Sequence, residues 1–235
     1  MRIAMLCALL LIGTAALAQT PEERLFEAIQ DSKPLVAEGL VADRAVNVAA
    51  RNADGETALH RAVEKGMREL AALLLRAGAR VSARSNSGET ALHLAALHAD
   101  PWYVDLLLAA RADPRARNDD GETPLHWAAL SGNVASAERL LARGADANIR
   151  DLKGNLPLHG AADGGDLETV QLMLKHTAEP GARNRDNRTP AEVARERGHT
   201  AIVNLLAVPP AQPKSNQGFQ TLDIDDPNHP RFQRY

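Results

Sequence analysis

The sequence predicts an all-α fold, a solenoid of stacked helix–turn–helix units with β-turn-like tips. The first observation is a 33-residue period in the glycines, which recur at Gly55, Gly88, Gly121 and Gly154. The second is that the stretches around them are copies: DGETALH at 54–60, SGETALH at 87–93 and DGETPLH at 120–126. Such a period is typical of a repeat array, in which each unit buries its apolar face against the next.

The first element is an N-terminal segment, residues 1–18, which has the pattern of a cleavable signal peptide. Arg2 gives it a basic start, an apolar run follows at 3–12, and ALA at 16–18 has the form of a cleavage site. The apolar run is shorter than the ~20 residues that span a bilayer. We therefore expect export without a membrane span, to the periplasm or, as the alternative, to the extracellular space.

The composition and the absence of known motifs argue against several classes of function. Cleavage would remove Cys7, the only cysteine, so the exported protein would hold no disulfide and no thiol nucleophile. The formal net charge is −3, which argues against a non-specific nucleic-acid binder. No hydrolase, metalloprotease or phosphate-loop motif occurs, so we expect no enzymatic activity and no cofactor.

The repeats divide the rest of the chain. Residues 19–51 read as a degenerate N-terminal capping repeat, and five repeats follow at 52–84, 85–117, 118–150, 151–183 and 184–207. In each unit a glycine turn precedes a Thr that caps the first helix, and prolines such as Pro124 occupy that helix's first position. Leucine pairs such as Leu140-Leu141 mark the second helix.

Two stretches, ETPLHWAALSGN at 122–133 and RLLARGADANIR at 139–150, resemble the ankyrin repeat, and the resemblance covers residues 52–207. It implies a non-enzymatic protein that binds a protein partner through its concave face and turn tips. Transferred to this sequence, the concave face selects five residues: Leu97, His98, Trp127, Leu130 and Ser131. Trp127 could serve either as a contact residue or as a core residue that fills the space left by Gly160.

The repeated Thr and His could either form a metal site or serve a structural role at the starts of the helices. Histidines in successive units lie ~8–10 Å apart, so they cannot share a zinc ion at ~2 Å per ligand. At the same place the last unit has Glu192, which completes a capping box with Thr189, and the N-terminal unit has Glu27. We therefore expect no metal, and a structural role at helix starts for Thr57, His60, Thr90, His93, Thr123, His126 and His159.

The tips carry a charge pattern. Glu56, Glu89 and Glu122 are expected to project from the tips and to alternate with the arginines five residues before them: Arg51, Arg84 and Arg117. Toward the C-terminal end the tips become basic, with Lys153, Arg185 and Arg188. This edge is either a solvated charged surface or a site for an acidic partner.

Two irregularities concern stability. Arg111 and Thr177 stand where other units have the glycine that ends the second helix, a conformation costly for other residues. The fourth unit carries Gly160 and Gly164 in or near its first helix. Gly160→Ala is expected to stabilise the array unless Trp127 packs against Gly160.

The last segment, residues 208–235, is rich in Pro, Asn and Gln and has no period, which favours a disordered or loosely docked tail. It nevertheless holds Phe219, Phe232 and Tyr235, so it either covers the last helix pair or serves as a recognition segment.

The expected function is a monomeric, exported binding protein that supports or protects another exported protein. Immunity against a periplasmic toxin, a host-directed effector and a small-ligand or metal binder are the alternatives.

Overall fold

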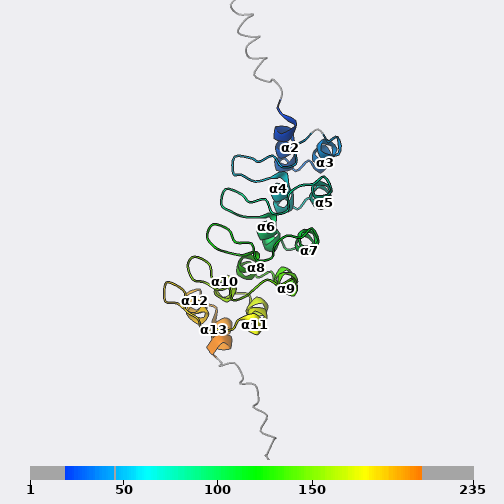
Figure 1. Ribbon diagram of the computed structural model, residues 1–235. Helices are drawn as coiled ribbons and strands as arrows, with labels where there is room; N and C mark the ends of the chain where they lie inside the picture. The colour runs from blue at the N-terminus through cyan, green and yellow to red at the C-terminus, as the bar shows by residue number, and fades with distance from the viewer. Residues whose placement is uncertain (1–18, 45, 208–235) are drawn as a thin grey trace, which may run out of the picture.

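The computed structural model describes residues 19–44 and 46–207 (Figure 1). The predicted signal peptide and the predicted tail lie outside these residues. Within the described ranges the regular structure is entirely helical, apart from one isolated bridge between Arg51 and Thr57. The all-α prediction is therefore confirmed.

The helices form two columns (Figure 1). The inner column stacks the first helix of every unit, and the outer column stacks the second. Long loops project from the inner column on the side away from the outer one, and we call the surface between these tips and the inner helices the inner face. The pairs, from the N-terminal unit onward, are α2 (Pro21–Gln30) and α3 (Pro34–Ala42), α4 (Ala58–Glu64) and α5 (Arg68–Arg76), α6 (Ala91–Leu97) and α7 (Trp102–Ala109), α8 (Pro124–Leu130) and α9 (Val134–Ala142), α10 (Pro157–Gly164) and α11 (Leu167–His176), α12 (Pro190–Glu196) and α13 (Thr200–Ala207).

The hydrophobic core is a thin layer, because many of the side chains packed between the helices are small. Fully buried alanines on the inner helices, such as Ala95 and Ala128, let neighbouring helices approach closely. Leucines at one position of the 33-residue repeat, such as Leu92 and Leu125, are also fully buried and fill the space between units. Each unit thus buries its apolar surface only against its neighbours.

The N-terminal unit does not follow the 33-residue pattern of the other units. Glu27 was expected to bond at a helix start, but it lies in the middle of α2, which begins earlier at Pro21. Thr20 and Glu23 form the capping box there: Thr20 Oγ1 accepts from the Glu23 N–H at 3.2 Å, and Glu23 accepts from the Thr20 N–H at 2.8 Å. A Thr-Pro pair with Glu at the third helical position is a stronger start signal than the repeat frame.

The two residues that replace a helix-ending glycine behave differently. Arg111 adopts the left-handed conformation, with φ of 65°, where Gly78 and Gly144 have φ of 90° and 89°. Thr177 avoids it, with φ of −92°, and its Oγ1 donates to the Met173 carbonyl at 2.8 Å. The expectation of strain at Thr177 was therefore wrong, because the hydroxyl satisfies a helix-end carbonyl in an extended conformation.

These conformations predict opposite effects of the same substitution. Arg111→Gly is expected to raise the free energy of unfolding by about 0.5–1 kcal/mol, because glycine adopts positive φ without steric strain. Thr177→Gly is expected to lower it by about 1–2 kcal/mol, because it removes a buried hydrogen bond and frees the unfolded backbone. Urea unfolding of both variants checks the pair, and equal signs would contradict the assignment.

Candidate functional site

The tips are built by one polar side chain per unit. Asn52 Oδ1 accepts from the N–H groups of Asp54 and Glu56 at 3.0 and 2.8 Å, which closes the turn. Ser85, Asn118, Asp151 and Asn184 bond to their own turns in the same way. The glycine that follows has positive φ in four units, from 73° at Gly55 to 78° at Gly154, and Asn187 takes its place in the last with φ of 61°.

The histidines bond within their own unit and to the next one. His60 Nδ1 accepts from the Thr57 N–H at 3.2 Å, so in the neutral ring Nε2 carries the proton. That Nε2 lies 3.2 Å from the Glu89 carbonyl of the following unit. His93, His126 and His159 repeat the contact at 3.2 Å with the carbonyls of Glu122, Asn155 and Arg188.

Their protonation follows from burial. Burial is the largest cause that lowers the pKa of His60, His126 and His159, and it lowers the pKa of His93 to about 4. Thr57, Thr90 and Thr123 each place Oγ1 within 3.0 Å of the ring's Nδ1, whereas His159 faces Leu156 and has only the N–H. Neutral histidines therefore fasten the tips of the second to fifth repeats to the first helix of the preceding repeat.

The arginines at the base of the tips also cross between units, and the predicted alternation with glutamate was wrong. Arg84 donates to the Arg117 carbonyl and Arg117 to the Arg150 carbonyl, each at 2.7 Å. Arg51 donates to the Arg84 carbonyl, and Arg150 to the Arg183 carbonyl at 3.0 Å. The guanidinium groups satisfy main-chain acceptors that no helix or sheet satisfies.

The glutamates are half-buried rather than projecting. Glu56 and Glu122 accept from the side-chain amides of Asn52 and Asn118, at 2.9 and 3.0 Å, beneath the turns. Glu89 pairs with Ser85 Oγ at 3.4 Å, and burial is the largest cause that raises its pKa. These three carboxylates therefore belong to the inner side of the tips.

The inner face contains a cavity of about 560 Å³ in the third to fifth units. It lies over Gly160. In the 33-residue repeat, Trp127 and Val193 occupy the position of Gly160 in the preceding and following units. Glycine has no side chain, so the space between Trp127 and Val193 stays empty. Trp127 and Leu130 form the apolar wall, and Leu130 is 46% exposed. A hollow of this size, with an apolar wall on one side and charged side chains around it, is typical of a binding site.

Trp127 is held in place by two contacts. Its Nε1 donates to Glu122 at 2.7 Å, and its ring packs edge-on against His93 with centroids 5.4 Å apart. The atoms nearest to a Cβ on Gly160 belong to His126 and Leu130, at 3.4–3.6 Å, so Trp127 does not fill that space. Its indole is half-buried and borders the cavity.

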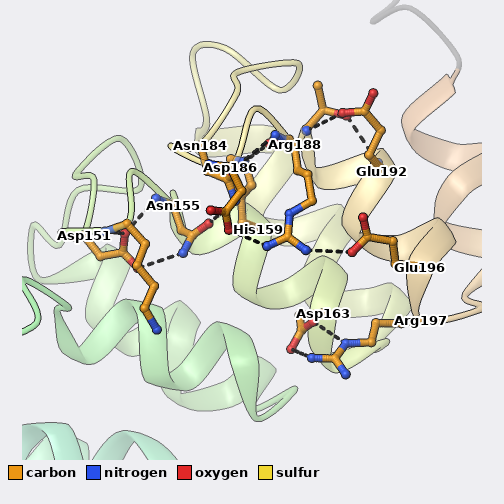
Figure 2. A network of polar contacts seen from close by, with 12 residues as sticks. Asp151, Asn155, His159, Asp163, Asn184, Asp186, Arg188, Glu192, Glu196 and Arg197 are labelled. Carbon is orange, nitrogen blue, oxygen red and sulfur yellow. Dashed lines mark hydrogen bonds and ion pairs between the residues drawn. The ribbon is translucent and has the colours of Figure 1, made fainter.

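A polar network of the fourth and fifth repeats (Figure 2) contributes Asp163, Asp186, Arg188, Glu196 and Arg197 to the lining of the cavity. Arg188 donates to Asp186 at 2.5 Å and to Glu196 at 2.7 Å, and Arg197 donates to Asp163 at 2.5 Å. The predicted basic character of this end is thus partly neutralised, since the charge of Arg188 is shared by two carboxylates. Lys153 and Arg185 remain exposed on the tips.

The structure brings some of the candidate residues together and separates others. Glu122, Trp127, Leu130, Lys153 and Arg188 line the same cavity. Leu97 is 48% exposed but outside it, and the His98 ring packs on Tyr103 with centroids 4.6 Å apart. The remaining candidates outside the cavity lining are Ser131, Glu56, Glu89 and Arg185.

Sequence reasoning missed Asp163, Glu196 and Arg197 as site residues. The 33-residue repeat could have indicated two of them, because Asp163 and Glu196 occupy the position of Leu130 in the next two units.

In residues 19–44 and 46–207, no group of three or more metal-ligating side chains comes together. In the same part of the chain, no helix is both long and apolar enough to cross a membrane.

Stacked two-helix units, linked by tip hydrogen bonds and hollowed on the inner face, define a helical-repeat protein-interaction module. The family model described as ankyrin repeats (3 copies) matches residues 25–118, 83–151 and 125–217. The chain therefore belongs to the ankyrin-repeat family, whose members are typically non-enzymatic. No curated protein matches the chain.

Proposed function

We propose that the chain is an exported binding protein that holds a protein partner on the inner face of its third to fifth repeats. The observation that carries the proposal is the cavity over Gly160, with Trp127 and Leu130 as its apolar wall. Large apolar side chains in a hollow, surrounded by charged groups that exclude water, are typical of the residues that dominate binding energy. The ion pairs of Arg188 and Arg197 form such a rim.

Export rests on the pattern of residues 1–18. A binding module without catalytic motifs acts by occupying its partner's surface. We therefore propose that it supports or protects another exported protein, and that it works as a monomer.

The test is affinity capture from a periplasmic extract, with a groove variant and a matched control. Trp127→Ala/Leu130→Ala is expected to weaken capture of the partner by about 30-fold or more, because two anchor residues are lost. The control is Leu35→Ala/Val36→Ala on α3, which removes side chains that are 82% and 49% exposed and far along the stack from the cavity. Equal capture by both variants, with circular dichroism showing that both are folded, would rule out this site.

A further inference from the structure

The tips beside the cavity present charges in a definite order. The fourth and fifth repeats present Lys153 and Arg185, and both are exposed, while the neighbouring Asp186 is paired with Arg188. The third repeat presents Asp119 and Asp120, which are also exposed, and Asp119 lies 3.0 Å from the guanidinium of Arg84. A chain that runs back along the inner face from the C-terminal end therefore meets positive tips first and negative tips next.

Residues 223–235 carry the complementary order. The acidic stretch DIDD at 223–226 comes first, and RFQRY at 231–235 follows with two arginines and no acid. The acidic stretch would face Lys153 and Arg185, and the arginines would face Asp119 and Asp120. Complementary charge patterns of this kind set the direction and register of docking.

The apolar groups match as well. Phe232 and Tyr235 belong to the basic stretch of the sequence, so the charge register would bring them to the level of Trp127 and Leu130, which border the cavity over Gly160. We propose that residues 223–235 dock on the inner face of this same chain, antiparallel to the order of the repeats, with Phe232 or Tyr235 in the cavity. Aromatic rings in such hollows bury large apolar areas and prefer edge-on or offset contact with another ring.

The tether makes this docking feasible. α13 ends at Ala207, and the fifteen residues before Asp223 reach up to ~50 Å when extended. The third repeat is two units back, at ~10 Å per unit. A short tether gives an effective concentration of about 1 mM, so even a segment of millimolar affinity occupies the groove about half of the time.

A docked segment would also compete with an external partner. That consequence rests on the proposed function, whereas the docking itself does not. Its test therefore uses the isolated full chain with no partner present.

The first experiment measures how accessible Trp127 is to acrylamide. A Trp102→Phe background leaves Trp127 as the only tryptophan of the chain. Adding Phe232→Ala/Tyr235→Ala is expected to raise the quenching constant about twofold, because the ring that covers the indole is lost. Phe219→Ala, outside the docking segment, is the matched control and is expected to change nothing.

The second experiment swaps charges. Asp119→Lys/Asp120→Lys is expected to raise the quenching constant to the same level, and Arg231→Asp/Arg234→Asp in the same chain is expected to restore it. The proposal is overturned if none of these variants changes the quenching. It is also overturned if the shielding depends on protein concentration, since a second copy would then occupy the groove. If quenching is unchanged but capture still depends on Trp127, only the docking proposal fails.

Discussion

Lowering the pH from 7 to 4.5 is expected to reduce the free energy of unfolding of this protein by several kcal/mol. His60, His93, His126 and His159 have pKa values lowered by burial in the folded chain. In the unfolded chain they return to the ordinary value of 6.5. The unfolded state therefore binds more protons as the pH falls below 6.5, and the stability contributed by the neutral rings is lost toward the folded pKa.

The size of the effect follows from His93. Its pKa of about 4, against an ordinary 6.5, corresponds to about 3 kcal/mol of stability that is lost as the pH falls from above 6.5 to below 4. The other three histidines shift in the same direction, so their contributions add in the same pH window. Protonation also places a second proton on Nδ1, where the backbone N–H of the helix start already donates.

The measurement is urea unfolding at steps between pH 7.5 and 4.5. His93→Gln is expected to be less stable than the original protein at pH 7. Its stability should also depend less on pH, by up to about 1.4 kcal/mol per pH unit, because one titrating group is gone. His176→Gln, on the exposed end of α11, serves as the control for a histidine outside this set. If His93→Gln and the original protein show the same pH dependence, the buried neutral ring is not the cause.

Carboxylates do not account for the change in this window. The pKa of Glu192 is lowered from 4.5, first by the hydrogen bond from the Thr189 backbone, so its contribution is lost only below that value. Glu89 has the opposite shift, raised by burial, and its protonation favours the folded state as the pH falls. A loss of stability between pH 6.5 and 5 therefore reports the histidines.

The histidines lie at every interface between the five repeats, which determines how acid acts on the array. Each Nε2–H donates to a carbonyl of the following unit, and the ring keeps this bond when it is protonated. The added proton goes to Nδ1, so the cost of protonation falls on the burial of the charged ring and on each unit's own helix start. Stability in a repeat array is the sum of unit terms and nearest-neighbour terms. Acid is therefore expected to act on the unit terms and to lower the midpoint of the unfolding transition.

The repeat period was sufficient to predict the fold, because side chains 33 residues apart occupy equivalent places in successive units. The same frame indicated that His60 and its copies serve helix starts. It could not show that each ring also reaches the next unit, since the acceptor is a main-chain carbonyl such as that of Glu89, which has no sequence signal. Arg84 bonds a carbonyl for the same reason, although Glu89 in the same tip looked like its partner.

The cavity was only partly predictable. Gly160 was visible as an irregularity, but whether a neighbour fills the space above a missing side chain depends on rotamers. Trp127 keeps its indole on Glu122 and His93 instead of leaning over Gly160. The ion pair of Arg197 joins two units, since Asp163 lies in the fourth repeat, whereas Arg188 pairs with Glu196 within the fifth.

Replacing Gly164 by alanine is expected to destabilise the protein by about 1–3 kcal/mol, the usual range of overpacking. A Cβ on Gly164 would lie 2.1 Å from the main-chain oxygen of Leu130 in α8. Leu130 is the last residue of α8, so relieving this contact would require the C-terminal end of α8 to move away from α10. The closely packed alanines between them, Ala128, Ala129, Ala161 and Ala162, would then lose contact.

Gly160, one helical turn earlier, gives the matched comparison. Its Cβ would lie 3.4 Å from the His126 oxygen and 3.5 Å from the Leu130 nitrogen, which is ordinary van der Waals contact. Gly160→Ala is therefore expected to stabilise the protein by about 0.5–1 kcal/mol, because alanine loses less backbone entropy in a helix. Both substitutions add one methyl group to α10, so intrinsic helix preference cannot explain opposite signs.

Urea unfolding, combined with hydrogen exchange of the α10 amides, distinguishes global stability from local opening. Gly164→Ala should lower the unfolding midpoint and speed exchange in α10 and in the α8 segment that ends at Leu130. Gly160→Ala should raise the midpoint and slow exchange in α10, since local opening of the fourth unit becomes less favourable. If both variants were stabilised, α8 and α10 would have to be further apart than the Leu130 contact requires. The cavity over Gly160 would then result from loose helix packing, and the missing side chain alone would not explain it.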